Sequence, residues 1–268
     1  MNTAIVIRVD VNSKIGAGHF IRQLALADFL KKNGYDIYFL STIENAQYET
    51  LLHEKNINYI PISKSVSLYT NQDINLTIQT YSKLNASWII LDGYSFNTDY
   101  QKGLKNYFLN ILSIDDFSNY TFHSDIILNP NTLNTQFYKT QPYTVQLLGP
   151  DYLLLRNAFK SKPNINSSYK SKKELSIFIS FGASDQDNIT EKTLHILNKI
   201  NKNIHCHILI GNMNSNSESI LNTCRKLIIK TTLHHHLNEK ELAKLMCKTD
   251  LAITSCSSIL WECLVLNT

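Results

Sequence analysis

A short loop containing two glycines and a histidine follows the first apolar run of the chain. The run covers residues 4–9, and the loop after it ends in Gly16-Ala17-Gly18-His19. Gly16 and Gly18 have no side chain, so the backbone can approach a ligand closely there. His19 is expected at the start of a helix, where the positive end of the helix dipole favours a neutral imidazole. The loop therefore predicts a general base, although a histidine that contacts phosphate or caps the helix fits the loop alone equally well.

Acidic and phenolic side chains follow two later strands of the first half. One expected strand ends in Asp92, with Tyr94 close behind it, and the next ends in Asp115 and Asp116. Ligands of open parallel sheets bind outside the carboxyl ends of the strands, so these side chains are candidates for one site. Adjacent residues of a strand point to opposite faces, so we expect one of Asp115 and Asp116 to lie with the site and the other to cap the turn. Each acid, taken alone, also fits a structural role.

Small and hydroxyl-bearing residues follow two strands of the second half. They are Gly182, Ala183, Ser184 and Asp185 after one strand, and Ser257 and Ser258 after a later one, with Glu262 one turn into the helix. Backbone amides in such turns can bind a phosphate or diphosphate. The glutamate is placed to accept hydrogen bonds from a ribose diol. An N-cap serine followed by a helix-surface glutamate explains the last set equally well.

The elements that must position these residues follow a βα pattern. Short β-branched runs alternate with segments of helical period, which is typical of parallel strands joined by crossover helices. The expected strands are residues 4–9, 37–41, 59–62, 88–92, 111–115, 126–128 and 144–148, then 175–181, 205–210, 227–230 and 251–254. The helices singled out are residues 20–32, capped by Gly34, then 188–200, 217–226, 239–247 and 258–266. The pattern predicts an α/β protein with two open parallel sheets.

A segment rich in proline, asparagine and serine interrupts the pattern near the middle of the chain. We place a first domain at residues 1–158, a linker at 159–173 and a second domain at 174–268. The basic residues of the linker have no aromatic platform among them, so they predict a solvated segment and no nucleic-acid partner. The last expected helix leaves no strand after it. We therefore expect the second sheet to be incomplete at its C-terminal side.

Composition narrows the class of protein. The chain has 268 residues, 43% hydrophobic and 18% charged, with a net charge of +4, which favours a globular protein over a disordered one. Neither a leader peptide nor an apolar stretch of membrane-spanning length is evident, so we expect a cytoplasmic protein without a membrane partner. The five cysteines lack CxxC spacing and are expected as small buried hydrophobes. His205, His207 and His234-His235-His236 lack ligand spacing, so no metal is expected.

Several motifs in order along nearly the whole chain resemble one known family. They are Arg8-Val9-Asp10, the loop of residues 15–19 with Arg22, Leu91-Asp92-Gly93-Tyr94, Asp115-Asp116, Leu128-Asn129-Pro130-Asn131, Leu148-Gly149 with Tyr152 and Arg156, Gly182 to Asp185, and Ser257-Ser258 with Glu262. Together they are similar to the PseG-type UDP-sugar hydrolases of pseudaminic acid biosynthesis. That family is itself similar to MurG-like glycosyltransferases of the GT-B fold.

The resemblance implies two Rossmann-like domains of GT-B type and an activity that needs neither cofactor nor metal. The reaction is removal of UDP from UDP-2,4-diacetamido-2,4,6-trideoxy-β-L-altropyranose. By resemblance, His19 activates the attacking water, Tyr94 places the sugar or the water, and Asp92 belongs to the same catalytic set. By the same resemblance, the residues expected to contact the substrate and UDP are Gly16, Gly18, Arg22, Gly182, Ala183, Ser184, Asp185, Ser257, Ser258 and Glu262.

Two departures from the family leave other functions open. Family members continue beyond the position of Thr268 by a strand and a helix, and many have glycine where this chain has Ala183. Alanine is tolerated there only if its φ is negative. A GT-B glycosyltransferase that deprotonates an acceptor hydroxyl, and a nucleotide-sugar binding protein without catalysis, are the alternatives.

Overall fold

The chain divides into two compact units. The computed structural model describes residues 3–107, 109–160, 174–200 and 202–268. Met1–Asn12 and His19–Leu154 make up the first unit, and Ser13–Gly18 and Leu155–Thr268 the second. The division falls close to the domain boundary that we place at residue 158. Most of the expected linker, residues 161–173, lies outside the described residues, but Phe159 is fully buried in a core of the second unit.

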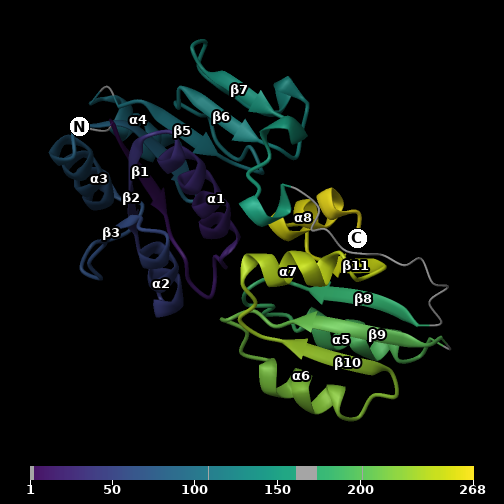
Figure 1. Ribbon diagram of the computed structural model, residues 1–268. Helices are drawn as coiled ribbons and strands as arrows, with labels where there is room; N and C mark the ends of the chain where they lie inside the picture. Colours follow the sequence, from purple (N-terminus) through teal and green to yellow (C-terminus); the bar gives the residue numbers. More distant parts are fainter. Residues whose placement is uncertain (1–2, 108, 161–173, 201) are drawn as a thin grey trace. The chain divides into compact units, whose positions relative to one another are not determined.

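The first unit is built on a parallel sheet (Figure 1). Within its described residues, the order of the seven strands is β3-β2-β1-β4-β5-β6-β7. The strands are β1 (Thr3–Val9), β2 (Tyr35–Ser41), β3 (Asn58–Pro61), β4 (Ala86–Asp92), β5 (Ile111–Ile114), β6 (Ile126–Asn129) and β7 (Val145–Leu148). All the strands expected in this half are confirmed, with ends that shift by one or two residues. The carboxyl ends of β1, β4, β5 and β6 therefore lie side by side.

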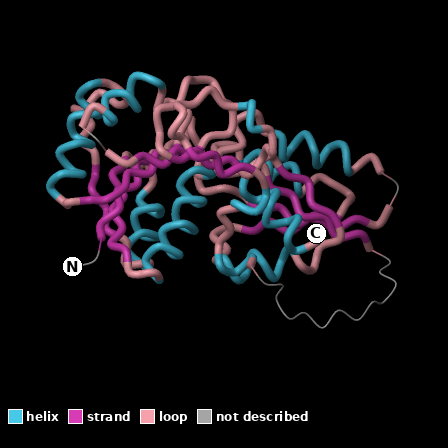
Figure 2. Tube along the Cα trace, turned by 90° about the horizontal axis from the view of Figure 1, so that it is seen from above, coloured by secondary structure: helices cyan, strands magenta, loops and turns pink. Residues whose placement is uncertain are grey.

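Helices cover both faces of this sheet. They are α1 (Gly18–Lys32), α2 (Ala46–Glu54), α3 (Asn71–Lys83) and α4 (Thr98–Lys105), with short 3-10 turns η1 (Thr135–Phe137) and η2 (Pro150–Tyr152). Figure 2 shows helices on either side of the strands near the N-terminus. Phe20 of α1 packs edge-on against Phe39 of β2, while Ile74 and Ile78 of α3 pack in a second cluster with Ile89 of β4. Burial of both faces explains why the strands read as nearly continuous apolar runs.

The second unit repeats the design with a smaller sheet. Its described strands are β8 (Leu175–Ser180), β9 (Ile204–Leu209), β10 (Lys230–His234) and β11 (Leu251–Thr254), all parallel in the order β10-β9-β8-β11. Its helices are α5 (Ile189–Leu197), α6 (Ser217–Cys224), α7 (Glu239–Met246) and α8 (Ser258–Leu266), preceded by the 3-10 turn η3 (Asn157–Phe159). One core cluster lies with α5 and α6 and another with α7 and α8.

One expected strand is wrong. We expected a strand at residues 227–230, but β10 begins at Lys230 and continues to His234. The apolar run before it instead lies beside the end of α5, where the amides of Ile228 and Ile229 donate to Asn198 Oδ1 at 2.8 and 3.3 Å. Ile228 is 92% exposed. The run was apolar enough to suggest a strand, but the side-chain amide of Asn198 satisfies its backbone instead of a neighbouring strand.

The cysteines follow the expectation in part. Cys206 and Cys263 are buried and burial raises the pKa of both thiols, to about 11 for Cys206 and about 12 for Cys263. Cys256 is exposed, which corrects the expectation that all five are buried. It lies in the turn before α8, where the backbone leaves the sheet and a side chain has no core to enter. None of the helices in the described part of the chain is apolar over a length that would cross a bilayer.

A buried ion cluster fixes the end of β1. Arg8 and Asp73 are both 0% exposed, and the Arg8 guanidinium donates to the Asp73 carboxylate at 3.2 and 2.8 Å. Arg8 also lies 2.7 Å from Asp10, which in turn accepts a hydrogen bond from the Tyr69 hydroxyl at 2.7 Å. Burial alone would lower the pKa of Arg8, but these two carboxylates raise it. The cluster ties β1 to the start of α3 and fixes the point from which the glycine loop leaves.

Removal of one charge from this cluster should destabilise the first unit. We expect Asp73→Asn to lower its free energy of unfolding by about 3 kcal/mol, because Arg8 then keeps a buried charge with one carboxylate fewer. Urea denaturation followed by Trp88 fluorescence measures this in a Trp261→Phe background, since the chain has two tryptophans. Asp28→Asn is the matched control. It breaks the ion pair between Asp28 and Lys55, whose side chains are 18% and 22% exposed. The free energy of unfolding should then fall by less than about 1 kcal/mol. An equal loss of unfolding free energy in Asp73→Asn and Asp28→Asn would contradict the stabilising role of the buried Arg8 cluster.

Candidate functional site

The imidazole of His19 is paired with a buried carboxylate. His19 is the second residue of α1 and Asp92 is the last residue of β4, so the crossover from β1 to α1 brings them to the same sheet edge. His19 Nδ1 lies 2.6 Å from Asp92 Oδ1, and the Asp92 side chain is 0% exposed. His19 is 6% exposed. The two residues form a histidine–carboxylate pair of the kind that orients a general base.

Two further side chains of α1 donate to Asp92. Arg22 donates from Nε at 2.7 Å and from Nη2 at 2.6 Å, and Gln23 donates from Nε2 at 2.6 Å. Burial by itself would raise the pKa of Asp92, but Arg22 and His19 hold it well below its usual range. Asp92 is therefore a carboxylate at neutral pH. His19, Arg22 and Gln23 are spaced i, i+3 and i+4, which places all three on one face of α1.

The charge on Asp92 decides the tautomer of His19. A carboxylate only accepts hydrogen bonds, so the short contact from Nδ1 requires a proton on that nitrogen. In the neutral ring the lone pair is then on Nε2. The Nη2 of Arg22 also lies 3.0 Å from Nδ1 and donates a proton to Asp92 at 2.6 Å, so both nitrogens point their hydrogens at the same carboxylate. The arrangement leaves Nε2 as the nitrogen that can accept a proton from a ligand or a water.

Tyr94 lies against the imidazole. Its ring meets the ring of His19 edge-on, with centroids 4.6 Å apart, and its hydroxyl donates to Asp116 Oδ2 at 3.2 Å. Burial and the Asp116 carboxylate raise the pKa of Tyr94, so it remains a phenol. Tyr120 donates to the backbone oxygen of Tyr94 at 2.8 Å. Tyr94 is 40% exposed, and its position is fixed at both ends.

The two adjacent acids after β5 have the separate roles expected from their alternation. Asp115 caps the turn, accepting from the amides of Phe117 at 2.9 Å and Ser118 at 2.6 Å. Asp116 instead accepts from Arg22 Nη1 at 3.1 and 3.3 Å and from Asn131 Nδ2 at 2.9 Å. Arg22 thus bridges Asp92 and Asp116, and its side chain is only 14% exposed.

The glycine loop has the open geometry expected of it. Gly16 has a φ of +80°, which a residue with a side chain would adopt only with strain, and a Cβ there would meet nothing within 4 Å. Gly18 begins α1, and a Cβ on it would also meet open space. Both glycines therefore have open space on the side where a Cβ would stand, although Ala17 between them is buried.

In the second unit the two small-residue turns follow neighbouring strands. Gly182 to Asp185 follow β8, and residues 255–258 follow β11, which pairs with β8. Asp185 caps α5, accepting from the amides of Ile189 at 2.8 Å and Thr190 at 3.0 Å, and is 7% exposed. Ala183 is not among the residues with positive φ, so alanine is tolerated where the family often has glycine.

A close backbone contact holds the first of these turns. A Cβ on Gly211, which follows β9, would lie 2.3 Å from the Ala183 carbonyl oxygen and 2.5 Å from that of Gly182. Any side chain at position 211 would clash with the backbone of Gly182 and Ala183, so only glycine fits there. The Met213 amide donates to the Ala183 oxygen at 3.0 Å, so the turn is fixed by the neighbouring loop. Sequence reasoning did not single out Gly211.

The start of α8 has uncapped amides. Ser257 is the N-cap residue, with extended backbone, but its side chain makes no capping hydrogen bond to the helix. Its hydroxyl lies 3.4 Å from that of Ser255. Ser258, the first helical residue, is partly exposed. The Leu260 amide donates to the Ser257 carbonyl oxygen at 3.0 Å, so in this first turn the amides of Ser258 and Ile259 are the ones offered to an anion.

Glu262 is buried and already has a partner. It is 2% exposed, so it is not the surface glutamate that the sequence left open. Arg156 donates to both its oxygens, at 2.7 and 2.6 Å, and packs over Phe159 with the guanidinium carbon 4.7 Å from the ring centroid. Burial alone would lower the pKa of Arg156, but the Glu262 carboxylate raises it. A ribose diol at Glu262 would share the carboxylate with Arg156.

Three histidines of the second unit, His205, His207 and His234, gather on β9 and β10. The rings of His205 and His207 lie 4.0 Å apart, and His207 Nδ1 is 3.2 Å from His234 Nε2. Burial and the neighbouring histidines lower the pKa of His207 to about 4. In the part of the chain that the structure describes, no three His, Cys, Asp or Glu side chains are arranged to hold a metal ion.

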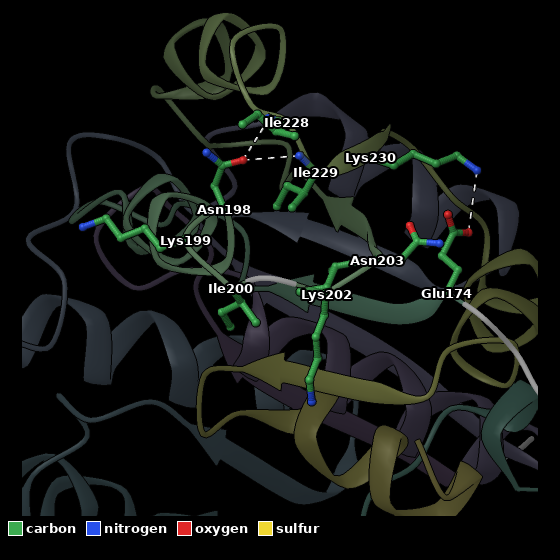
Figure 3. Close-up of a pocket in the computed structure, with 10 residues that line it drawn as sticks. Glu174, Asn198, Lys199, Ile200, Lys202, Asn203, Ile228, Ile229 and Lys230 are labelled. Atoms are coloured by element: carbon green, nitrogen blue, oxygen red, sulfur yellow. Dashed lines mark hydrogen bonds and ion pairs between the residues drawn. The ribbon is translucent and has the colours of Figure 1, made fainter.

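A pocket of about 520 Å³ lies in the second unit, away from the predicted residues. It is lined by Glu174, the ends of helix and turn at residues 198–200 and 202–203, and Ile204, Ile228, Ile229 and Lys230. Ile204 and Lys230 are the first residues of β9 and β10, so the pocket is at the amino ends of these strands. Figure 3 shows Lys199, Lys202 and Lys230 pointing away from one another. Ligands of such sheets bind at the opposite ends, and the lysines do not converge on an anion.

Sequence reasoning found four of the residues in the first cluster and missed others. His19, Arg22, Asp92 and Tyr94 are brought together as expected, but Gln23 was not singled out. The signal for Gln23 was its i+4 spacing from His19 on α1. Asn131 was named in the Leu128-Asn129-Pro130-Asn131 motif but was not assigned to the site. The signal for it was the place of that turn after β6, which neighbours β5.

Comparisons with known proteins support this fold. No family model matches the chain. An uncharacterized protein of Methanocaldococcus jannaschii is 25% identical over 98% of this chain, which spans only 54% of that relative's length. A UDP-2,4-diacetamido-2,4,6-trideoxy-β-L-altropyranose hydrolase of Campylobacter jejuni is 26% identical over 98% of this chain and 88% of its own. These identities show distant similarity over nearly the whole chain.

Solved structures show the same architecture. MurG of Acinetobacter baumannii superposes with a TM-score of 0.64 at 14% identity, covering 98% of this chain and 76% of its own. HepE of Anabaena, in complex with UDP and glucose, superposes with a TM-score of 0.66 at 9% identity, covering 99% of this chain and 79% of its own. The chain therefore has the GT-B type of fold, with two Rossmann-like units.

The depressed pKa of Asp92 makes a pH-dependent prediction. The stability that this carboxylate contributes is complete above the pKa of an unfolded aspartate, about 3.9, and is lost as the pH falls towards the lower folded value. At pH 7, Asp92→Asn should lower the free energy of unfolding of the first unit by about 3 kcal/mol. The difference from the parent should stay constant between about pH 5 and 8 and shrink below about pH 4. Urea denaturation across pH, followed by Trp88 fluorescence, measures it; a difference that stays constant down to pH 2 would be evidence against an ionised Asp92.

Proposed function

We propose that this protein hydrolyses a UDP-linked amino sugar to UDP and the free sugar. The observation that carries the proposal is the His19–Asp92 pair, in which the carboxylate accepts the proton of Nδ1 and Nε2 is the nitrogen left to accept one. A nitrogen so placed can act as the general base that activates a water. The similarity to the Campylobacter jejuni hydrolase supports the same reaction.

In the reaction that we propose, the His19–Asp92 pair acts on a water. His19 Nε2 takes a proton from water while the water oxygen forms a bond to the anomeric carbon of the sugar. The bond from that carbon to the phosphate oxygen breaks, and its electron pair leaves with UDP. The imidazolium is stabilised by Asp92 until it returns the proton to solvent. Arg22 and Gln23 keep the Asp92 carboxylate in place, and Tyr94 confines the imidazole ring.

We assign UDP to the second unit. The amides of Ser258 and Ile259 in the first turn of α8, together with the fixed turn from Gly182 to Ser184, are the backbone groups that we assign to a diphosphate. HepE, with the same fold, is known in complex with UDP. Glu262 would accept the ribose hydroxyls while keeping Arg156 as a partner, since a carboxylate has room for about four hydrogen bonds.

The substrate that we propose is UDP-2,4-diacetamido-2,4,6-trideoxy-β-L-altropyranose, in pseudaminic acid biosynthesis. Its support is the ordered set of motifs along the chain together with the C. jejuni relative. A glycosyltransferase is the competing activity, because MurG has the same fold. The two differ in whether water or an acceptor hydroxyl receives the sugar.

Loss of the His19 imidazole should abolish hydrolysis but leave the affinity for UDP unchanged. We expect His19→Ala to lower kcat at least a hundredfold with UDP affinity unchanged, because general-base catalysis contributes about 10²–10⁴-fold. UDP release is followed by chromatography, and UDP binding by calorimetry. His53→Ala is the matched control, since His53 is an exposed histidine of α2 in the same unit.

Turnover in ¹⁸O-labelled water identifies the bond that breaks. We expect the label in the free sugar and none in UDP, because water attacks the anomeric carbon. Label in UDP would show attack at phosphorus and contradict the mechanism. No turnover without an added sugar acceptor would favour the glycosyltransferase, and UDP binding without turnover under any condition would leave only a binding protein.

A negative charge at the start of α8 should repel the diphosphate. Aspartate is favourable in the first turn of a helix, so Ser258→Asp should fold normally and yet weaken UDP binding at least tenfold. Ser217→Asp is the matched control, because Ser217 is the first residue of α6 in the same unit. Calorimetric titration with UDP measures both. Equal affinity in the two variants would place the diphosphate elsewhere.

A further inference from the structure

Three rings form a row that leads away from the reacting nitrogen. His19 meets Tyr94 at 4.6 Å between centroids, and Tyr94 meets Phe117 at 4.7 Å with the planes tilted by 53°. Exposure increases along the row, from 6% for His19 to 40% for Tyr94 and 57% for Phe117. A single exposed phenylalanine has no special meaning, but this one continues a row that begins at the proposed base.

The turn that carries Phe117 is rigid. Asp115 accepts from the amides of Phe117 and Ser118, and the Ser118 hydroxyl donates to the backbone oxygen of Phe137. Ser118 itself has a φ of +58°, which costs strain that these hydrogen bonds offset. The ring of Phe117 is therefore presented by a fixed backbone, as a binding surface requires.

The hydroxyl of Tyr94 can meet a ligand only as a hydrogen-bond acceptor. Its proton is committed to Asp116 Oδ2, at 3.2 Å, and the Asp116 carboxylate is itself held by Arg22 and Asn131. A carboxylate has no proton to give, so the direction of this hydrogen bond is fixed. The lone pairs of Tyr94 Oη then remain for an N–H or O–H donor. An acceptor and an exposed apolar ring thus stand side by side.

We propose that Tyr94 and Phe117 form a subsite for an acetamido group of the sugar. The amide N–H donates to Tyr94 Oη and the methyl group packs on the Phe117 ring. The inference rests on the proposed function and names the residues that select an N-acetylated sugar over a hydroxylated one. A hydroxyl at that place could satisfy Tyr94, but it would leave the Phe117 ring without an apolar partner.

The subsite is tested by binding, so that turnover does not enter the result. His19→Ala protein is titrated by calorimetry with UDP-2,4-diacetamido-2,4,6-trideoxy-β-L-altropyranose and with its analogue in which hydroxyls replace both acetamido groups. The measured quantity is the ratio of the two dissociation constants. We expect Phe117→Ser to lower the preference for the acetamido sugar about tenfold, the effect of one methyl group in an apolar pocket. Phe117→Leu, which keeps an apolar surface, should retain most of it.

Phe29→Ser is the matched control. Phe29 is 54% exposed and lies on α1, ten residues and about 15 Å along the helix from His19. The same ratio in Phe117→Ser and Phe29→Ser would overturn the subsite, whatever the outcome for hydrolysis. Conversely, a loss of discrimination in Phe117→Ser supports the subsite even if wild-type protein releases no UDP, a result that would count against the proposed function alone.

Discussion

The buried carboxylate of Asp92 is the interaction on which the first unit's site depends. It has no exposed surface, and its charge is balanced by Arg22 and by hydrogen bonds from His19 and Gln23. A charge so placed would be very costly without these donors. The same contacts fix the proton on His19 Nδ1, hold Arg22 against Asp116 and, through Asp116, fix the hydroxyl of Tyr94. The orientation of His19, Arg22 and Tyr94 thus follows from one ionised side chain.

Parallel topology brings these groups together. β1, β4, β5 and β6 are neighbours, so the segments after them meet at one edge although they are far apart in the chain. The buried Arg8 cluster fixes the start of the first of these segments, and Asp115 fixes the turn of the third. Rigid supports of this kind preorganise a site, so that its polar groups need not reorganise during reaction.

Much of this was predictable from the sequence, because apolar periodicity and the order of strands decide which side chains reach the edge. The strands of the first unit, the meeting of His19, Asp92 and Tyr94, and the division of roles between Asp115 and Asp116 all follow from periods of 2 and 3.6 residues. The position of β10 did not follow from these periods. The backbone of the apolar run before β10 is satisfied by Asn198, which lies thirty residues before Ile228. The pairing of Glu262 with Arg156 is also beyond local patterns, since it joins residues 106 positions apart.

The central claim is that Asp92 holds His19 with a lone pair on Nε2. The most direct measurement is ¹⁵N NMR of histidine-labelled protein, with His19 assigned by its loss in His19→Ala. Our account predicts, for the neutral ring, a proton on Nδ1, hydrogen-bonded to the carboxylate, and an Nε2 shift typical of an unprotonated nitrogen. A proton on Nε2 with an unprotonated Nδ1 would contradict it, because the nitrogen available to water could then only donate.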